Sequence, residues 1–126
     1  MTTLYRAAND DYVDSGYAFA EEIETARMYL DNPGFGGANI YRCKARGKVL
    51  DLTGMTMAEA AAELDMEDPG AIGVDEWIPR TVDALETAQA RGYSWIKVDE
   101  SYPRGTTTWI WCGDVDSEPE LTEVAS

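Results

Sequence analysis

Arg6 is the first residue whose type and position suggest nucleotide chemistry. It lies in the middle of the strand-like stretch TLYRAA, where a guanidinium is costly to bury unless it meets an anion. Its planar fork of donors suits a phosphate, a ribose or the carboxylate of a partner. The alternative is an arginine on an edge strand that points into water.

Three aromatic residues form a second candidate group. Tyr17 and Phe19 are two residues apart in YAFA, so a strand would place them on one face. Tyr29 follows in the helix that we expect over residues 21–31. These rings could form a cleft that sandwiches a planar ligand ring, or they could be ordinary core residues.

Asp99 and Glu100 are the candidate acids. They follow the strand-like stretch YSWIKV and open the polar segment DESYPRG, so a carboxylate there can face a cleft or simply belong to a turn. The chain has no histidine, and its two cysteines are far apart. This composition excludes histidine-based triads and the common zinc geometries, so we expect no metal site.

The elements that would position these groups mix strands and helices without a regular βαβ repeat. Expected strands cover residues 3–8, 17–20, 38–45, 48–52, 93–98 and 106–112, and expected helices cover 21–31, 57–64 and 75–91. The strands 38–45 and 48–52 flank the short turn RGK and have the pattern of a hairpin. The order favours an α+β domain with largely antiparallel sheets.

The composition indicates one domain with a substantial core. The chain has 126 residues, of which 44% are hydrophobic, and no apolar run is long enough to span a membrane. The first residues lack the features of a secretory signal, so we expect a cytoplasmic protein with Cys43 and Cys112 reduced and buried. We expect the domain to cover residues 1–112 and the acidic stretch 113–126 to be a disordered tail.

The charge limits the partners. Ten Lys and Arg against 24 Asp and Glu give a net charge of −14. Such a surface repels phosphate backbones and anionic membranes, so we expect no direct nucleic-acid or membrane binding. The charge serves solubility, or it lets the protein compete with nucleic acid for a basic protein partner.

Taken together, these pieces resemble the ADP-ribosyltransferase fold over roughly residues 3–112. LYRA is similar to the first-strand motif, in which an arginine holds the nicotinamide ribose of NAD. SGYAFAEEIETARMYLD is similar to the second motif, a strand that enters a helix bearing an alanine and then a tyrosine, here Ala26 and Tyr29. Relatives carry Ser or Tyr where this chain has Ala18, and the family glutamate aligns with Thr108.

The resemblance implies two small, mostly antiparallel sheets with three helices around an NAD-type cleft. Arg6 would orient NAD as the substrate, and Tyr29 with Tyr17 or Phe19 would stack on nicotinamide. Because Thr108 cannot carry a negative charge, Glu100 or Asp99 would stabilise the oxocarbenium-like ribose. The implied function is an NAD-dependent ADP-ribosyltransferase that modifies a protein target.

The chain is also similar to phage-encoded anti-CRISPR proteins of this fold, which implies an anti-defence role. A second reading is a non-catalytic acidic protein, a nucleic-acid mimic that blocks the basic channel of a host defence complex. Charge complementarity would then give fast, salt-sensitive association. A third reading is a small structural or adaptor domain without a ligand.

Overall fold

The computed structural model describes residues 2–30, 39–55, 57–65, 82–99 and 106–124. These residues form an α+β fold with one seven-stranded mixed sheet and three α-helices, so the predicted fold class is confirmed. The strands are β1 (Thr3–Ala8), β2 (Ala18–Ala20), β3 (Asn39–Lys44), β4 (Lys48–Asp51), β5 (Tyr93–Asp99), β6 (Thr107–Trp111) and β7 (Thr122–Val124). The helices are α1 (Ile23–Arg27), α2 (Met57–Glu63) and α3 (Val82–Ala90). None of the described helices is long and apolar enough to cross a membrane.

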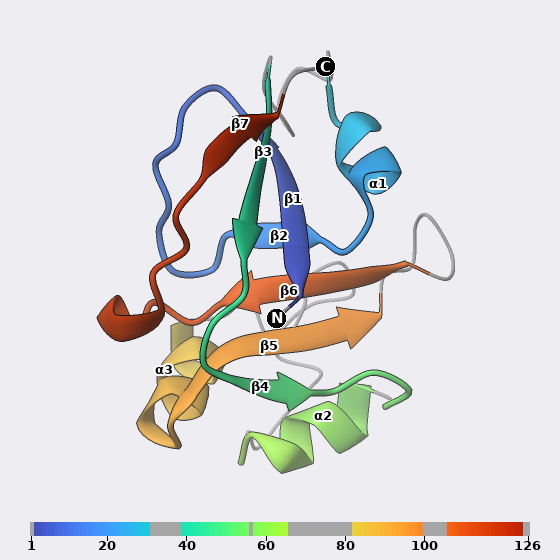
Figure 1. The fold of residues 1–126 in the computed structure, drawn as a ribbon. Helices are drawn as coiled ribbons and strands as arrows, with labels where there is room; N and C mark the ends of the chain where they lie inside the picture. The colour runs from blue at the N-terminus through green and yellow to red at the C-terminus, as the bar shows by residue number, and fades with distance from the viewer. Residues whose placement is uncertain (1, 31–38, 56, 66–81, 100–105, 125–126) are drawn as a thin grey trace.

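The sheet changes direction between β2 and β1. The strand order is β4-β5-β6-β2-β1-β3-β7, and all neighbours are antiparallel except β4 and β5. β1 and β2 share the single register pair Tyr5 and Ala20, whereas β1 pairs with β3 along its whole length. Figure 1 shows β1 and β3 running across the direction of β2, β6 and β5. The structure therefore has one continuous sheet where two small sheets were expected. Because β1 and β2 share only one register pair, there is space between them beside β1.

The predicted hairpin of residues 38–45 and 48–52 is wrong. β3 lies between β1 and β7, whereas β4 lies at the far edge of the sheet in a parallel ladder with β5. The segment between them crosses over the start of β5, where a Cβ on Gly47 would meet the Ser94 Oγ at 2.1 Å. Gly47 also has φ +95°, which favours glycine. RGK is thus a crossing between the two parts of the sheet.

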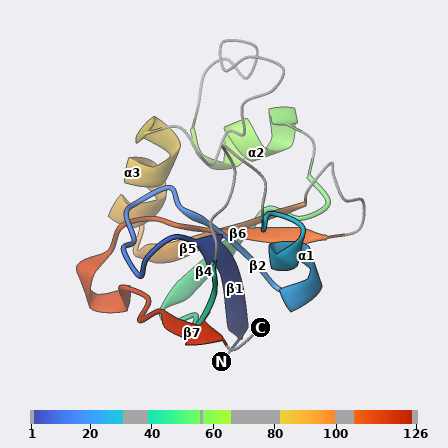
Figure 2. The same cartoon turned by 90° about the horizontal axis from the view of Figure 1, so that it is seen from above.

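Two cores lie on opposite faces of β5 and β6. On one face, Leu50, Ile96, Val98 and Ile110 pack against the apolar sides of α2 and α3. On the other face, Leu4 and Cys43 pack with an aromatic cluster that consists of Phe19, Trp95, Trp109 and Trp111. Figure 2 shows α2 and α3 on one side of β5 and β6, with β1 and β7 on the other.

Both cysteines behave as the sequence predicts. Cys43 and Cys112 are free and buried, and they belong to the two different cores. Burial raises the pKa of each thiol to about 12, so neither forms a reactive thiolate near neutral pH. Both are structural residues.

The prediction of a disordered tail is wrong for residues 113–124. A short 3₁₀ helix (Val115–Ser117) precedes β7, which pairs with β3 from Arg42 to Ile40. The Trp111 Nε1 donates to the Ser117 Oγ at 3.3 Å, and Leu121 packs on the aromatic cluster. Most of the acidic side chains that suggested disorder are exposed, whereas Pro119 is buried and Leu121 is partly buried.

Two helices differ from their expected lengths. α1 ends at Arg27, and residues 28–30 continue as turns, so the expected helix 21–31 is shorter. α3 is described from Val82, and the first part of the expected helix, residues 75–81, lies outside the described residues. Each end of the six expected strands agrees with the structure to within one residue.

Candidate functional site

A pocket of about 340 Å³ opens where the ladder between β1 and β2 narrows. Its walls come from β1, from β2 and the two residues before it, from α1 and from one residue of β6. The lining residues in the described chain are Tyr5, Arg6, Ala7, Gly16, Tyr17, Ala18, Phe19, Ala20, Thr25, Ala26, Tyr29 and Thr108. All four residues predicted to bind NAD, together with the threonine at the family's acid position, therefore line one cavity.

Arg6 is held by the wall of this pocket. β1 is an interior strand of the sheet, so the reading of Arg6 as an edge-strand residue is wrong. Its Nη1 donates to the Ala18 carbonyl oxygen at 2.8 Å, and its Cζ lies 4.3 Å from the centre of the Tyr17 ring. The Phe19 ring centre is 5.8 Å away. A backbone acceptor and two ring faces thus fix a half-buried positive charge in the pocket.

The three predicted aromatic residues differ in their surroundings. Phe19 is only 2% exposed and packs edge-on against Trp95, with the ring centres 5.4 Å apart, so most of its ring belongs to the core. Tyr17 is half-buried and meets both Arg6 and Tyr12. Tyr29 is half-buried beyond the end of α1, beside the small core of Ala7, Ala26 and Ile40. Tyr17 and Tyr29 are therefore the rings with surface to offer a ligand.

The pocket is open because several of its lining side chains are small. Gly16 and the alanines at 7, 18, 20 and 26 line it. α1 places Thr25 and Ala26 toward the interior, while Glu24 and Arg27 form an exposed ion pair on its outer side at 2.5 Å. The buried side of α1 thus forms one wall of the pocket.

Sequence reasoning missed two further lining residues, Tyr5 and Thr25. Thr25 lies one helical turn before Tyr29, so the i, i+4 rule could have added it to the predicted group. Thr25 and Thr108 are both buried, and both line the pocket. Tyr5 carries no comparable signal, because it neighbours Arg6 and a regular strand would place it on the opposite face.

The predicted acids do not lie in the described lining. Asp99 ends β5, and its Oδ2 accepts a hydrogen bond from the Gly54 backbone N–H at 2.7 Å. Asp99 pairs with Thr107, one residue from the lining residue Thr108. Glu100 lies outside the described residues. Among the lining residues that the structure describes, Arg6 is the only charged one.

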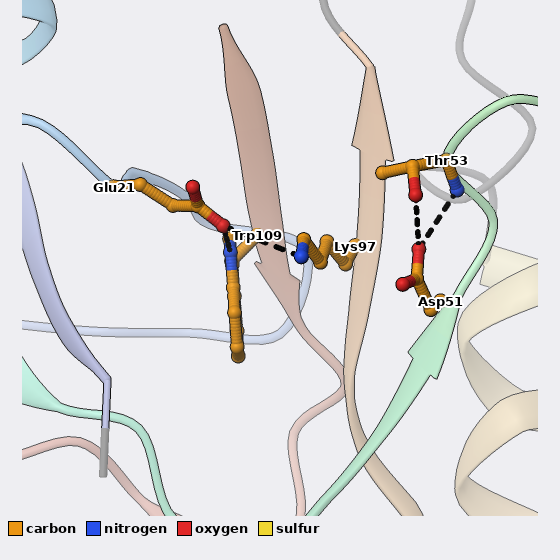
Figure 3. A network of polar contacts seen from close by, with 5 residues as sticks. All are labelled: Glu21, Asp51, Thr53, Lys97 and Trp109. Carbon is orange, nitrogen blue, oxygen red and sulfur yellow. Dashed lines mark hydrogen bonds and ion pairs between the residues drawn. The ribbon is translucent and has the colours of Figure 1, made fainter.

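A polar network that the sequence did not reveal lies beside the pocket, and Figure 3 shows its members. Glu21 directly follows the lining residue Ala20, and its Oε1 accepts from the Trp109 Nε1 at 2.7 Å. The Lys97 Nζ is 3.6 Å from the same oxygen and 5.7 Å from the centre of the Trp109 ring. Glu21 therefore ties the end of β2 to β5 and β6.

Asp51 extends this network to β4. Its Oδ1 accepts from the Thr53 backbone N–H at 2.9 Å and from the Thr53 Oγ1 at 2.5 Å. These hydrogen bonds hold the pKa of the Asp51 carboxyl below its ordinary value, and the charge of Lys97 adds to the effect. Asp51, Lys97 and Trp109 occupy one register row across three strands, on the face away from α2 and α3.

The described residues contain no group of three or more acidic, cysteine or histidine side chains that could hold a metal ion. Comparison of the chain with family models, with curated proteins and with solved structures finds no match. The site is therefore interpreted from its own residues.

Proposed function

We propose that the protein is an ADP-ribosyltransferase-like enzyme that uses NAD as a substrate and modifies a protein target. The observation that carries the proposal is the convergence of Arg6, Tyr17, Phe19 and Tyr29 on one pocket. Arg6 lies in β1, Tyr17 and Phe19 lie just before and within β2, and Tyr29 lies beyond the end of α1. Such convergence supports a nucleotide site better than a core without a ligand.

The size and chemistry of the pocket suit the nicotinamide half of NAD. A volume of about 340 Å³ is near the lower end of the range for small-molecule sites, about 300–1,000 Å³. The face of Tyr29 is suited to the flat, positively charged nicotinamide ring, and Tyr17, which lies against Arg6, provides a neighbouring wall. The Arg6 guanidinium offers donors to ribose or phosphate oxygens. We expect the adenosine half to extend out of the pocket.

The reaction breaks the bond between the ribose C1′ and the nicotinamide nitrogen, and nicotinamide leaves with the bonding electrons. Positive charge then spreads over C1′ and the ring oxygen until a nucleophile of the target attacks C1′ and loses its proton. A carboxylate beside C1′ stabilises this charge and accepts the proton. Asp99 and Glu100 remain the proposed acids, since Asp99 ends β5, Glu100 follows it in the sequence, and β5 pairs with β6, the strand that contributes Thr108 to the pocket.

We further propose a cytoplasmic, anti-defence role of the anti-CRISPR type, in which the target is a basic nucleic-acid-binding protein or complex. The net charge of −14 supports this choice of partner. Complementary charge steers association with a basic channel and makes it sensitive to salt.

A non-catalytic acidic binder is the second candidate. The observation in its favour is that no carboxylate occurs among the described lining residues of the pocket. In this alternative the protein would block a basic channel as a nucleic-acid mimic. Inhibition of the target would then be independent of NAD.

The direct experiment incubates the protein and NAD with purified candidate nucleic-acid-binding complexes and measures the intact mass of every subunit. We expect a gain of one ADP-ribose on a target subunit and release of nicotinamide. Arg6→Lys, which keeps the charge but loses the planar fork, should lower the rate at least ~10-fold. Arg27→Lys is the matched control on the exposed side of α1. No mass gain, or equal rates for both variants, would contradict the proposal.

A further inference from the structure

A second hollow lies outside the pocket, on the opposite side of Tyr17. It is a groove of about 440 Å³ between the loop at residues 11–13 and the segment 118–121 that leads into β7. The sequence prediction placed the second wall in a disordered tail. The groove exists because β7 pairs with β3 and holds this segment against the body of the protein.

Apolar residues anchor both walls of the groove. Val13 and Pro119 are buried, and Leu121 is partly buried. Val13 and Leu121 both pack with the aromatic cluster, so each wall is attached to the same core. The groove is therefore preformed, and a ligand would not have to pay for ordering it.

The rim of the groove is acidic. Asp11, Glu118 and Glu120 line it with exposed side chains, and no Lys or Arg occurs among its described lining residues. Tyr12 stands beside them with 58% of its surface exposed, which is unusual for a large aromatic residue. Apolar surface framed by carboxylates complements a chain that carries both apolar and basic side chains.

We propose that this groove binds an extended basic segment of the protein target, in which Arg or Lys alternates with apolar residues. The apolar side chains would lie on Tyr12 and Leu121, while the basic ones would reach the carboxylates of Asp11, Glu118 and Glu120. Nucleic acid and anionic lipid are disfavoured by the same carboxylates. A small polycation would satisfy the rim but leave the apolar surface exposed to water.

The groove and the pocket share an aromatic wall. Tyr12 of the groove meets Tyr17 of the pocket edge-on, with the ring centres 6.1 Å apart, and Tyr17 in turn lies against Arg6. A segment held in the groove is thus docked beside the proposed NAD site. Only this positional link rests on the proposed function, because binding of a basic segment requires no NAD.

The test measures binding of a fluorescein-labelled peptide of alternating Arg and Leu by anisotropy, without NAD. We expect the double variant Glu118→Gln/Glu120→Gln to weaken binding about 5- to 10-fold, the effect of two partly exposed charge pairs. The matched control Glu63→Gln/Glu86→Gln removes two exposed charges from α2 and α3 and should change affinity less than about 2-fold. Tyr12→Ala, which changes no charge, should also weaken binding.

Equal losses in the groove and control variants would overturn the proposal, because they would show attraction by net charge alone. Absence of binding by the wild-type protein would overturn it as well. Full displacement of the peptide by spermine at equal charge concentration would show a polycation site and would contradict a peptide groove. NAD binding by the Glu118→Gln/Glu120→Gln variant is measured in parallel and should not change, so failure of the groove is distinguishable from failure of the NAD site.

Discussion

The polar network around Glu21 gives a prediction whose size follows from the structure. In Glu21→Ala, the Trp109 Nε1 loses the acceptor that lies 2.7 Å away, although the tryptophan residue is only 6% exposed. A buried donor without a partner costs ~1–3 kcal/mol, and the lower half of this range applies because the Glu21 side chain is about one-third exposed. Loss of the pair with Lys97 adds ~0.2–1 kcal/mol. We therefore expect Glu21→Ala to lower the free energy of unfolding by ~1.2–3 kcal/mol.

The matched variant Glu21→Gln keeps an acceptor oxygen for Trp109 and removes only the charge, so it should cost ~0.5 kcal/mol. Trp109→Phe removes the donor, and in that background Glu21→Ala should cost less by about 1 kcal/mol than in the wild type. Urea unfolding followed by circular dichroism measures the wild type, the three single variants and the double variant. Equal losses in Glu21→Ala and Glu21→Gln, or a coupling near zero, would refute a structural role for this hydrogen bond.

Three further predictions test the elements that frame the site. Gly47→Ala should lower the free energy of unfolding by at least ~2 kcal/mol, because the new Cβ would clash with Ser94 and because Gly47 has φ +95°. A neutral effect in urea unfolding would contradict the close approach of the segment between β3 and β4 to β5. Deletion of residues 119–126 should lower the thermal midpoint by several degrees, since it removes β7 and the buried Pro119; an unchanged midpoint would contradict a stabilising role for the pairing of β7 with β3. The folded-state pKa of Asp51 is depressed, so its contribution is present above the ordinary value of 3.8 and is lost as the pH falls below it. Asp51→Asn should therefore lose less stability than the wild type on acidification through this range, and parallel pH profiles would contradict the bond to Thr53.

The sequence located most of the strands because their signals are local. β1 agrees with the expected residues 3–8, and β5 differs from 93–98 by one residue. Strand pairing was not predictable in the same way, because a short segment between two strand patterns does not determine whether the two strands pair with each other or with other strands. β4 takes β5 as its neighbour because that ladder places Leu50 and Leu52 under the helices. The acidic composition of residues 113–124 likewise hid the apolar residues that anchor them.

The candidate site was predictable to the extent that single residue types carry chemistry. A mid-strand arginine and period-two aromatics pointed to Arg6, Tyr17 and Phe19, all of which line the pocket. The position of Thr108 in the wall depends on the pairing of β6 with β2, which no local pattern encodes. The groove beside Tyr12 could not be anticipated at all, because its second wall depends on the pairing of β7 with β3.

The central claim is that the pocket between β1, β2 and α1 binds NAD, and calorimetry tests it most directly. The wild-type protein should bind NAD at one site, while Ala18→Leu, which places a larger side chain in the pocket, should weaken binding at least ~10-fold. Ala62→Leu, at an exposed position of α2, is the control for an added side chain and should bind as the wild type does. No binding by the wild-type protein, or equal affinity of Ala18→Leu, would contradict the claim.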